Sequence, residues 1–154
     1  MASGTKFDTA FLRIAATAAV SLSKDPTTKV GAVVATPDQR QFSLGYNGFP
    51  VGMAETPQRW ERPAKYSRVV HAEINSILNC PFDTKGCTMY CTITPCTQCL
   101  HMMRNARIER VVFLRAHRAV ETKDMELWKE AASLFPGTVQ QLSDPIAEYI
   151  LSTF

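Results

Sequence analysis

The 154-residue sequence has no uninterrupted apolar run long enough to cross a bilayer. The segment that most resembles a targeting signal is AFLRIAATAAVSL at residues 10–22, but Arg13 interrupts it and its apolar spacing fits an amphipathic helix. The sequence also lacks internal repeats, low-complexity segments and any stretch with the composition of an interdomain linker. These absences predict a single domain over residues 1–154 with no membrane anchor.

The sequence also lacks a large excess of charge of either sign. The formal net charge is +3, which is too small to indicate nucleic acid or an anionic membrane as the main partner. A small anionic ligand is compatible with this balance, so we expect a small-molecule partner and regard nucleic acid as the weaker alternative.

Cysteines are few, and their number is odd. The five are Cys80, Cys87, Cys91, Cys96 and Cys99, which without a secretory signal argues against a disulfide framework and for a cytoplasmic protein with reduced thiols. Cys87 and Cys91 would lie about 13 Å apart along one strand and could not bind one ion together. We therefore interpret Cys80, Cys87 and Cys91 as core or near-surface thiols.

Hydrophobic periodicity and turn residues predict alternating helices and strands. The first helix starts after Thr5-x-x-Asp8, which resembles a capping box. Residues 47–68 contain two glycines and three prolines and are predicted to form a long ordered loop. The remaining elements are predicted as strands at 30–35, 41–46, 87–93, 110–115 and 138–142, and helices starting near 71, 96, 122 and 146. This order predicts an α/β fold with a mixed five-stranded sheet and helices on both faces.

The most informative motif is PCTQC at residues 95–99, which directly follows a predicted strand. Two cysteines three residues apart in a first helical turn lie on one face, so Cys96 and Cys99 could bind one metal ion. The helix N-terminus also favours the thiolates that a metal requires. The same spacing occurs in redox-active pairs, so this motif alone leaves both interpretations open.

His71 and Glu73 favour the metal interpretation. His71 also begins a helix after an extended segment, which makes it a plausible third ligand. Residues two apart on a helix point in directions about 200° apart, so Glu73 would not bind the ion with His71 but could lie near its open position. Two thiolates, one imidazole and a water molecule form the catalytic pattern of zinc, which lowers the pKa of that water to about 7. Glu73 would then transfer its proton.

These motifs carry a family resemblance. His71-Ala72-Glu73 and the PCTQC segment match the H-x-E and P-C-x-x-C signature of zinc-dependent deaminases. SKDP at 23–26, KVGA at 29–32 and GYNGFP at 45–50 resemble the deoxycytidylate deaminase branch of the cytidine and deoxycytidylate deaminase family. The similarity extends from about residue 7 to residue 114.

The resemblance implies a three-layer α/β/α cytidine deaminase-like fold and the hydrolysis of dCMP to dUMP and ammonia. It also implies that His71, Cys96 and Cys99 hold one catalytic Zn²⁺ and that Glu73 carries protons. Asn47 would contact the nucleotide sugar. By the same resemblance we expect a homo-oligomer, specifically a hexamer, and regulation by dCTP or dTTP with Mg²⁺.

Departures from the family pattern leave alternatives for the substrate. After the strand at 110–115, where many relatives have a substrate-contacting tyrosine, this chain has Arg115-Ala116-His117-Arg118. CMP, a 5-modified dCMP and a base within nucleic acid, as in tRNA-type deaminases, are the alternatives to dCMP. A protein with structural zinc is the non-enzyme alternative.

The residues that would bind a phosphate are not fixed by the resemblance. Arg115 and Arg118 are candidates, as are the four cations of residues 59–68. The alternative for the latter segment is a solvated loop in which Trp60 and Tyr66 pack against the body of the domain.

Overall fold

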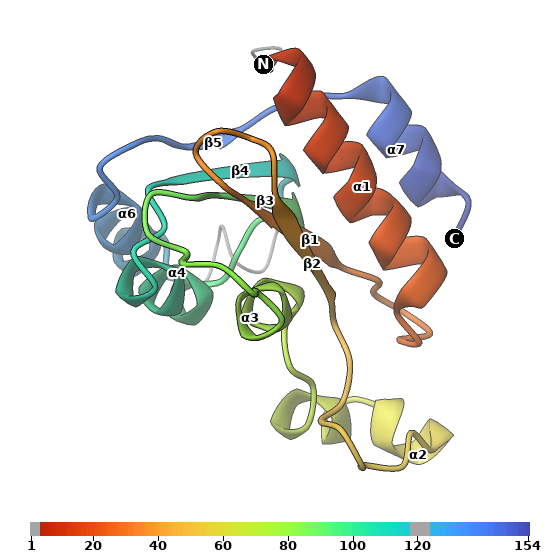
Figure 1. Cartoon of the computed structure of the whole chain (residues 1–154). Helices are drawn as coiled ribbons and strands as arrows, with labels where there is room; N and C mark the ends of the chain where they lie inside the picture. The colour runs from red at the N-terminus through yellow and green to blue at the C-terminus, as the bar shows by residue number, and fades with distance from the viewer. Residues whose placement is uncertain (1–3, 118–123) are drawn as a thin grey trace.

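The computed structural model describes residues 4–117 and 124–154 (Figure 1). In chain order the elements are α1 (Lys6–Leu22), β1 (Gly31–Ala35), β2 (Phe42–Tyr46), α2 (Pro57–Trp60), the 3₁₀ helix η1 (Ala64–Ser67), α3 (Ala72–Leu78), β3 (Thr88–Ile93), α4 (Thr97–Asn105), β4 (Arg110–Arg115), α6 (Met125–Ser133), β5 (Val139–Gln141) and α7 (Pro145–Ser152). The predicted order of strands and long helices is confirmed. The predicted start of a helix at residue 122 lies outside the described residues.

The strands form one mixed sheet in the order β2-β1-β3-β4-β5. β1 is antiparallel to both β2 and β3, whereas β3, β4 and β5 are mutually parallel neighbours. α1 and α7 cover one face, and α3, α4 and α6 cover the other (Figure 1). The predicted three-layer architecture is therefore confirmed.

Alternation along the strands divides the apolar interior into two cores. Met89 and Cys91 of β3 pack in the core beneath α3, α4 and α6. Tyr90, between them, packs in the core beneath α1 and α7. This follows from the period of two in strand side chains.

Two glycines allow the helices to approach the sheet closely. A Cβ atom on Gly31 would overlap the carbonyl oxygen of Ala15 in α1, and one on Gly45 would overlap the carbonyl oxygen of Ala72 in α3. Any side chain at Gly45 would therefore displace α3, the helix that follows His71. The first glycine of the GYNG segment, Gly45, is therefore required by the close packing of β2 on α3, and α3 begins next to the candidate site.

The segment between β2 and α3 is ordered but is not simply a loop, because it contains α2 and η1. The Gly48–Val70 bridge closes it at its base, with backbone N···O distances of 3.2 and 2.7 Å. Trp60 is buried, but the ring on which it stacks, at a centroid distance of 4.1 Å, is that of Phe49 in the same segment and not in the body of the domain. Tyr66, by contrast, is 61% exposed, so its predicted packing is wrong.

None of the helices within residues 4–117 and 124–154 combines the length and the hydropathy that crossing a bilayer requires.

Candidate active site

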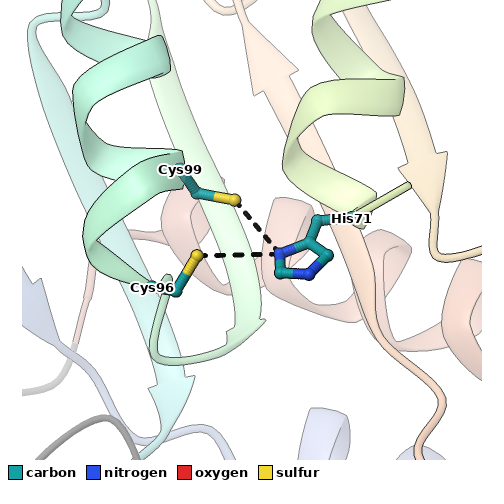
Figure 2. A group of neighbouring side chains, drawn as sticks. All are labelled: His71, Cys96 and Cys99. Carbon is teal, nitrogen blue, oxygen red and sulfur yellow. Dashed lines mark hydrogen bonds between the residues drawn. The ribbon is translucent and has the colours of Figure 1, made fainter. Parts of the chain in front are cut away.

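Three potential metal ligands converge where α3 and α4 begin. Nδ1 of His71 lies 3.7 Å from Sγ of Cys96 and 3.3 Å from Sγ of Cys99 (Figure 2). A tetrahedral zinc ion at its usual bond lengths would separate a nitrogen ligand from a sulfur ligand by about 3.6 Å. Within the described residues, no other group of three or more His, Cys, Asp or Glu side chains is close enough to share an ion. The donor types and their spacing fit zinc.

The local backbone leaves these ligands free to converge. His71 is the N-cap of α3 and Cys96 is the N-cap of α4, both with extended backbone angles. Neither side chain makes a capping hydrogen bond, so neither is used to satisfy its own helix. Cys99 follows in the first turn of α4. The partial positive charge of the helix N-terminus favours thiolate at these positions.

The two thiols differ in proton affinity because they share a proton. The hydrogen bond with Cys99, followed by that with His71, lowers the pKa of Cys96 to about 4. The same hydrogen bond, together with burial, raises the pKa of Cys99. The hydrogen bond between the two sulfurs therefore favours the thiolate at Cys96 over that at Cys99. Because a metal requires both as thiolates, its binding would release a proton.

Glu73 lies inside the site, whereas His71 lies at its exposed rim. The Glu73 side chain is 3% exposed, and its carboxyl group lies beside Cys99. Burial raises its pKa, which favours a carboxyl group that can both accept and return a proton. Glu73 is not one of the three grouped ligands, whereas His71 is, so a role for Glu73 beside the open position stays a prediction.

The turn that carries Cys96 is held by contacts that the sequence did not predict. Trp128 of α6 donates its indole N–H to the carbonyl oxygen of Pro95 at 2.9 Å, and its ring meets Phe113 edge-on at 6.3 Å. Thr94 joins the ends of β3 and β4, because its backbone N–H donates to the carbonyl oxygen of Arg115 at 2.8 Å. A tryptophan in an amphipathic helix carries no sequence signal for such a role.

Asn47, the predicted sugar contact, lies next to the Gly48–Val70 bridge and is 6% exposed. Its Nδ2 donates to the carbonyl of Thr28 at 2.8 Å and to Asp25 at 3.3 Å. Its Oδ1 accepts from Ser23 at 2.7 Å and from the Val30 N–H at 2.9 Å. Asn47 therefore anchors the segment between α1 and β1, and its contact with a sugar stays a prediction.

A buried ion pair supports the same region. Lys65 donates to Asp25 at 2.9 Å, and both side chains are at most 5% exposed. Asp25 also accepts from the backbone N–H groups of Thr27 and Thr28. The pair ties η1 to the α1–β1 segment. Lys65 was one of the four cations predicted as candidates for phosphate contact, but its ammonium group is committed to this pair.

The remaining cysteines behave as predicted core or near-surface thiols. Cys87 and Cys91 are buried and Cys80 is half-buried. Burial raises the pKa of Cys91, which lies near Glu73 but does not join the ligand group. This arrangement does not supply the third sulfur that a closed structural site would require.

Arg115 and Arg118 were the other cations predicted as candidates for phosphate contact. Arg115 lies at the end of β4, where its Nε donates to Glu148 at 2.6 Å. Arg118 lies outside the described residues.

Comparison with known proteins agrees with this geometry. Residues 5–115 match the family described as the cytidine and deoxycytidylate deaminase zinc-binding region. The predicted extent of similarity, residues 7 to 114, is thereby confirmed.

Individual relatives are named deoxycytidylate deaminases. The chain is 42% identical over 109 residues to a probable deoxycytidylate deaminase of Caenorhabditis elegans, covering 68% of this chain and 55% of that protein. It is 38% identical over 109 residues to the deoxycytidylate deaminase of Mus musculus, covering 65% and 61%. The matches thus span a little over half of the length of these relatives.

A solved structure shows the same fold. The dCMP deaminase of cyanophage S-TIM5, in complex with dCMP and dUMP, superposes with a TM-score of 0.71 at 21% identity over 92% of this chain and 100% of that chain. The match over residues 5–115 includes all three candidate ligands and Glu73. The chain belongs to the cytidine and deoxycytidylate deaminase family.

Proposed function

We propose that the protein hydrolyses a cytosine mononucleotide, with dCMP and water giving dUMP and ammonia. The observation that carries this proposal is the group of three ligands beside a buried carboxyl group that has no lysine or arginine partner in the described part of the chain. The names of the relatives support dCMP over other cytosine nucleotides.

His71, Cys96 and Cys99 would hold one Zn²⁺, whose chemistry is to acidify a bound water to a pKa of about 7. Glu73 accepts a proton from the attacking water and delivers it to N3 of the base. It then transfers the second proton of that water to the departing amine. The C4–N bond breaks as the new C4–O bond becomes the carbonyl of uracil, so the water supplies one oxygen to the base, one proton to N3 and one to ammonia.

Further properties are proposed on the family relationship alone. The protein forms a homo-oligomer, specifically a hexamer, and dCTP or dTTP with Mg²⁺ regulates it in the cytoplasm. Light scattering with and without these nucleotides tests the assembly, and assays with added dCTP or dTTP test the regulation.

The function is tested by measuring ammonia release from dCMP, CMP, 5-methyl-dCMP, deoxycytidine and a single-stranded oligonucleotide. The proposal predicts the highest kcat/KM for dCMP. Turnover of the oligonucleotide alone, with a steep decrease on adding salt, would instead identify a nucleic-acid deaminase.

A further inference from the structure

Asn75 of α3 makes two side-chain hydrogen bonds to backbone outside its own helix. Its Nδ2 donates to the carbonyl oxygen of Tyr46 at 2.9 Å and to that of Val70 at 3.4 Å. Tyr46 is the last residue of β2, and Val70 directly precedes His71. One amide group therefore joins the end of a strand to the chain that enters the candidate metal ligands.

The carbonyl group of Tyr46 lies on the open edge of the sheet. β2 stands at the end of the strand order and pairs with β1 on one side. The N–H of Asn47 donates to the Val30 carbonyl on that side. Because the N–H and C=O of one trans peptide point in opposite directions, the Tyr46 carbonyl faces away from β1. Asn75 supplies the donor that a further strand would otherwise provide.

Asn75 also bonds to both peptide units that flank the Cα atom of His71. Its side chain donates to the Val70 carbonyl, and its backbone N–H donates to the His71 carbonyl at 3.0 Å. The Val70 carbonyl accepts from the Gly48 N–H as well, at the point where the chain returns from α2 to α3 (Figure 1). The backbone of His71 is therefore fixed from both sides by a single residue.

We propose that Asn75 is a positioning residue that fixes His71 relative to Asn47, the predicted sugar contact. The bond to Tyr46 holds the residue before Asn47, and the bonds on either side of His71 hold the ligand. This inference rests on the proposed function and deepens it. A nucleotide whose sugar contacts Asn47 reaches the metal ligands correctly only if these two residues keep a constant separation, and a misplacement of about 1 Å can cost about 100-fold in rate.

Ser43 provides a matched contrast. It also joins β2 to α3, because its buried hydroxyl group donates to the Ser76 carbonyl at 2.8 Å. This bond reaches α3 five residues after His71 rather than at the peptide units beside it. Loss of either hydrogen bond weakens the contact between β2 and α3, but only the loss of Asn75 releases the backbone of His71.

The test compares the zinc-loaded full chain with Asn75→Ala, Asn75→Leu and Ser43→Ala. Leucine keeps the branched shape of asparagine without its N–H groups. Both Asn75 variants are expected to release zinc to a chromophoric chelator about tenfold faster, since residues that orient a metal ligand change metal affinity by about 10- to 100-fold. Their kcat for dCMP should fall about tenfold or more while KM stays within about threefold, because the contacts to the substrate remain.

Ser43→Ala should unfold at a lower urea concentration, because it loses a buried hydrogen bond. Its zinc release and its kcat should stay within about twofold of the unmodified protein. The same profile for the Asn75 variants would assign Asn75 to stability alone and overturn the proposal. An increase in KM with unchanged kcat and zinc release would also overturn it, and so would faster zinc release with unchanged kcat.

Failure of the proposed function gives a different result. If the unmodified protein binds zinc but releases no ammonia from dCMP, the rate of zinc release still tests the role of Asn75. Faster release from both Asn75 variants than from Ser43→Ala would support the positioning of His71. Equal rates for all four proteins would refute it.

Discussion

Asp8 and Glu73 are buried to the same extent, each 3% exposed, yet their surroundings shift their pKa values in opposite directions. Burial raises the pKa of both. For Asp8, hydrogen bonds from Arg110 at 2.8 and 3.1 Å, from Tyr90 at 2.7 Å and from the Thr5 N–H at 3.1 Å outweigh burial and lower the pKa to about 2. For Glu73, burial prevails and the pKa is raised.

The difference separates a carboxylate that stabilises the fold from the carboxyl group that we propose carries protons. Asp8 joins α1 to β3 and β4 beneath a bidentate guanidinium, an arrangement suited to holding a permanent charge. Glu73 lies beside the candidate metal ligands without such a partner, so burial favours its neutral form. Burial alone does not define the role of a carboxyl group; its partners do.

The largest effect is expected from Glu73→Gln. This variant keeps the shape of the side chain but removes its proton transfer, so kcat for dCMP should decrease by about 10³-fold or more. Zinc content, measured by elemental analysis, should stay near one ion per chain. Activity within tenfold of the unmodified protein would exclude Glu73 as the proton carrier.

Asp8→Asn should lower the stability of the fold and leave kcat unchanged, in contrast to Glu73→Gln. It leaves the partly buried Arg110 without its counter-ion and should lower the free energy of unfolding by about 3 kcal/mol, measured in urea. The kcat of the protein that remains folded should be unchanged. The exposed Glu130 of α6, replaced by Gln, serves as a control whose effect should stay below about 0.5 kcal/mol. Equal effects of the two variants would mean that the Asp8 cluster does not stabilise the fold.

The dependence of folding stability on pH also distinguishes Asp8 from Glu73. Because the pKa of Asp8 is lowered from 3.8 to about 2 in the folded state, its ionised form contributes about 2 kcal/mol that is fully present above pH 3.8 and is lost as the pH falls toward 2. The difference in stability between the unmodified protein and Asp8→Asn should therefore narrow over this range in urea titrations.

For Glu73, the dependence of stability on pH should have the opposite sign. Its raised pKa stabilises the metal-free fold below the unfolded value of 4.5, and this contribution is lost as the pH rises through the folded value. Metal-free Glu73→Gln should therefore gain stability relative to the unmodified protein above pH 4.5. A loss of stability there would show that the Glu73 carboxylate is stabilised in the fold.

A smaller effect is expected from Trp128→Phe, which keeps an aromatic ring against Phe113 but removes the hydrogen bond to Pro95. Because this bond positions the turn that carries Cys96, zinc should dissociate about three- to tenfold faster, measured with a chromophoric chelator. Trp60→Phe changes the other tryptophan of the chain, at a distance from the ligands, and should leave the rate unchanged. Equal rates for all three proteins would assign Trp128 to packing alone.

Much of the fold was predictable because its signals are local. The capping box at Thr5 and Asp8 forms as the sequence indicates, and Asp144 caps α7, which begins at Pro145. The helices at residues 57–60 and 64–67 were missed, because each is only four residues long and has no apolar period to detect. Their order comes from the stacking of Trp60 and the pairing of Lys65, which are contacts distant in sequence.

The candidate ligands were predictable for a related reason. Cys96 and Cys99 lie in one helical turn, and His71 begins a helix of its own, so short motifs report their positions. Trp128 and Asp25 could not be found in this way. Their roles depend on partners 33 and 40 residues away, and no spacing in the sequence records such a distance.

The proposed activity requires that His71, Cys96 and Cys99 bind one zinc ion and leave its fourth position to water. X-ray absorption at the zinc edge of the purified protein measures this coordination. We expect two sulfur ligands, one imidazole nitrogen and one light oxygen ligand. A shell with three or four sulfurs, or with no sulfur, would contradict it.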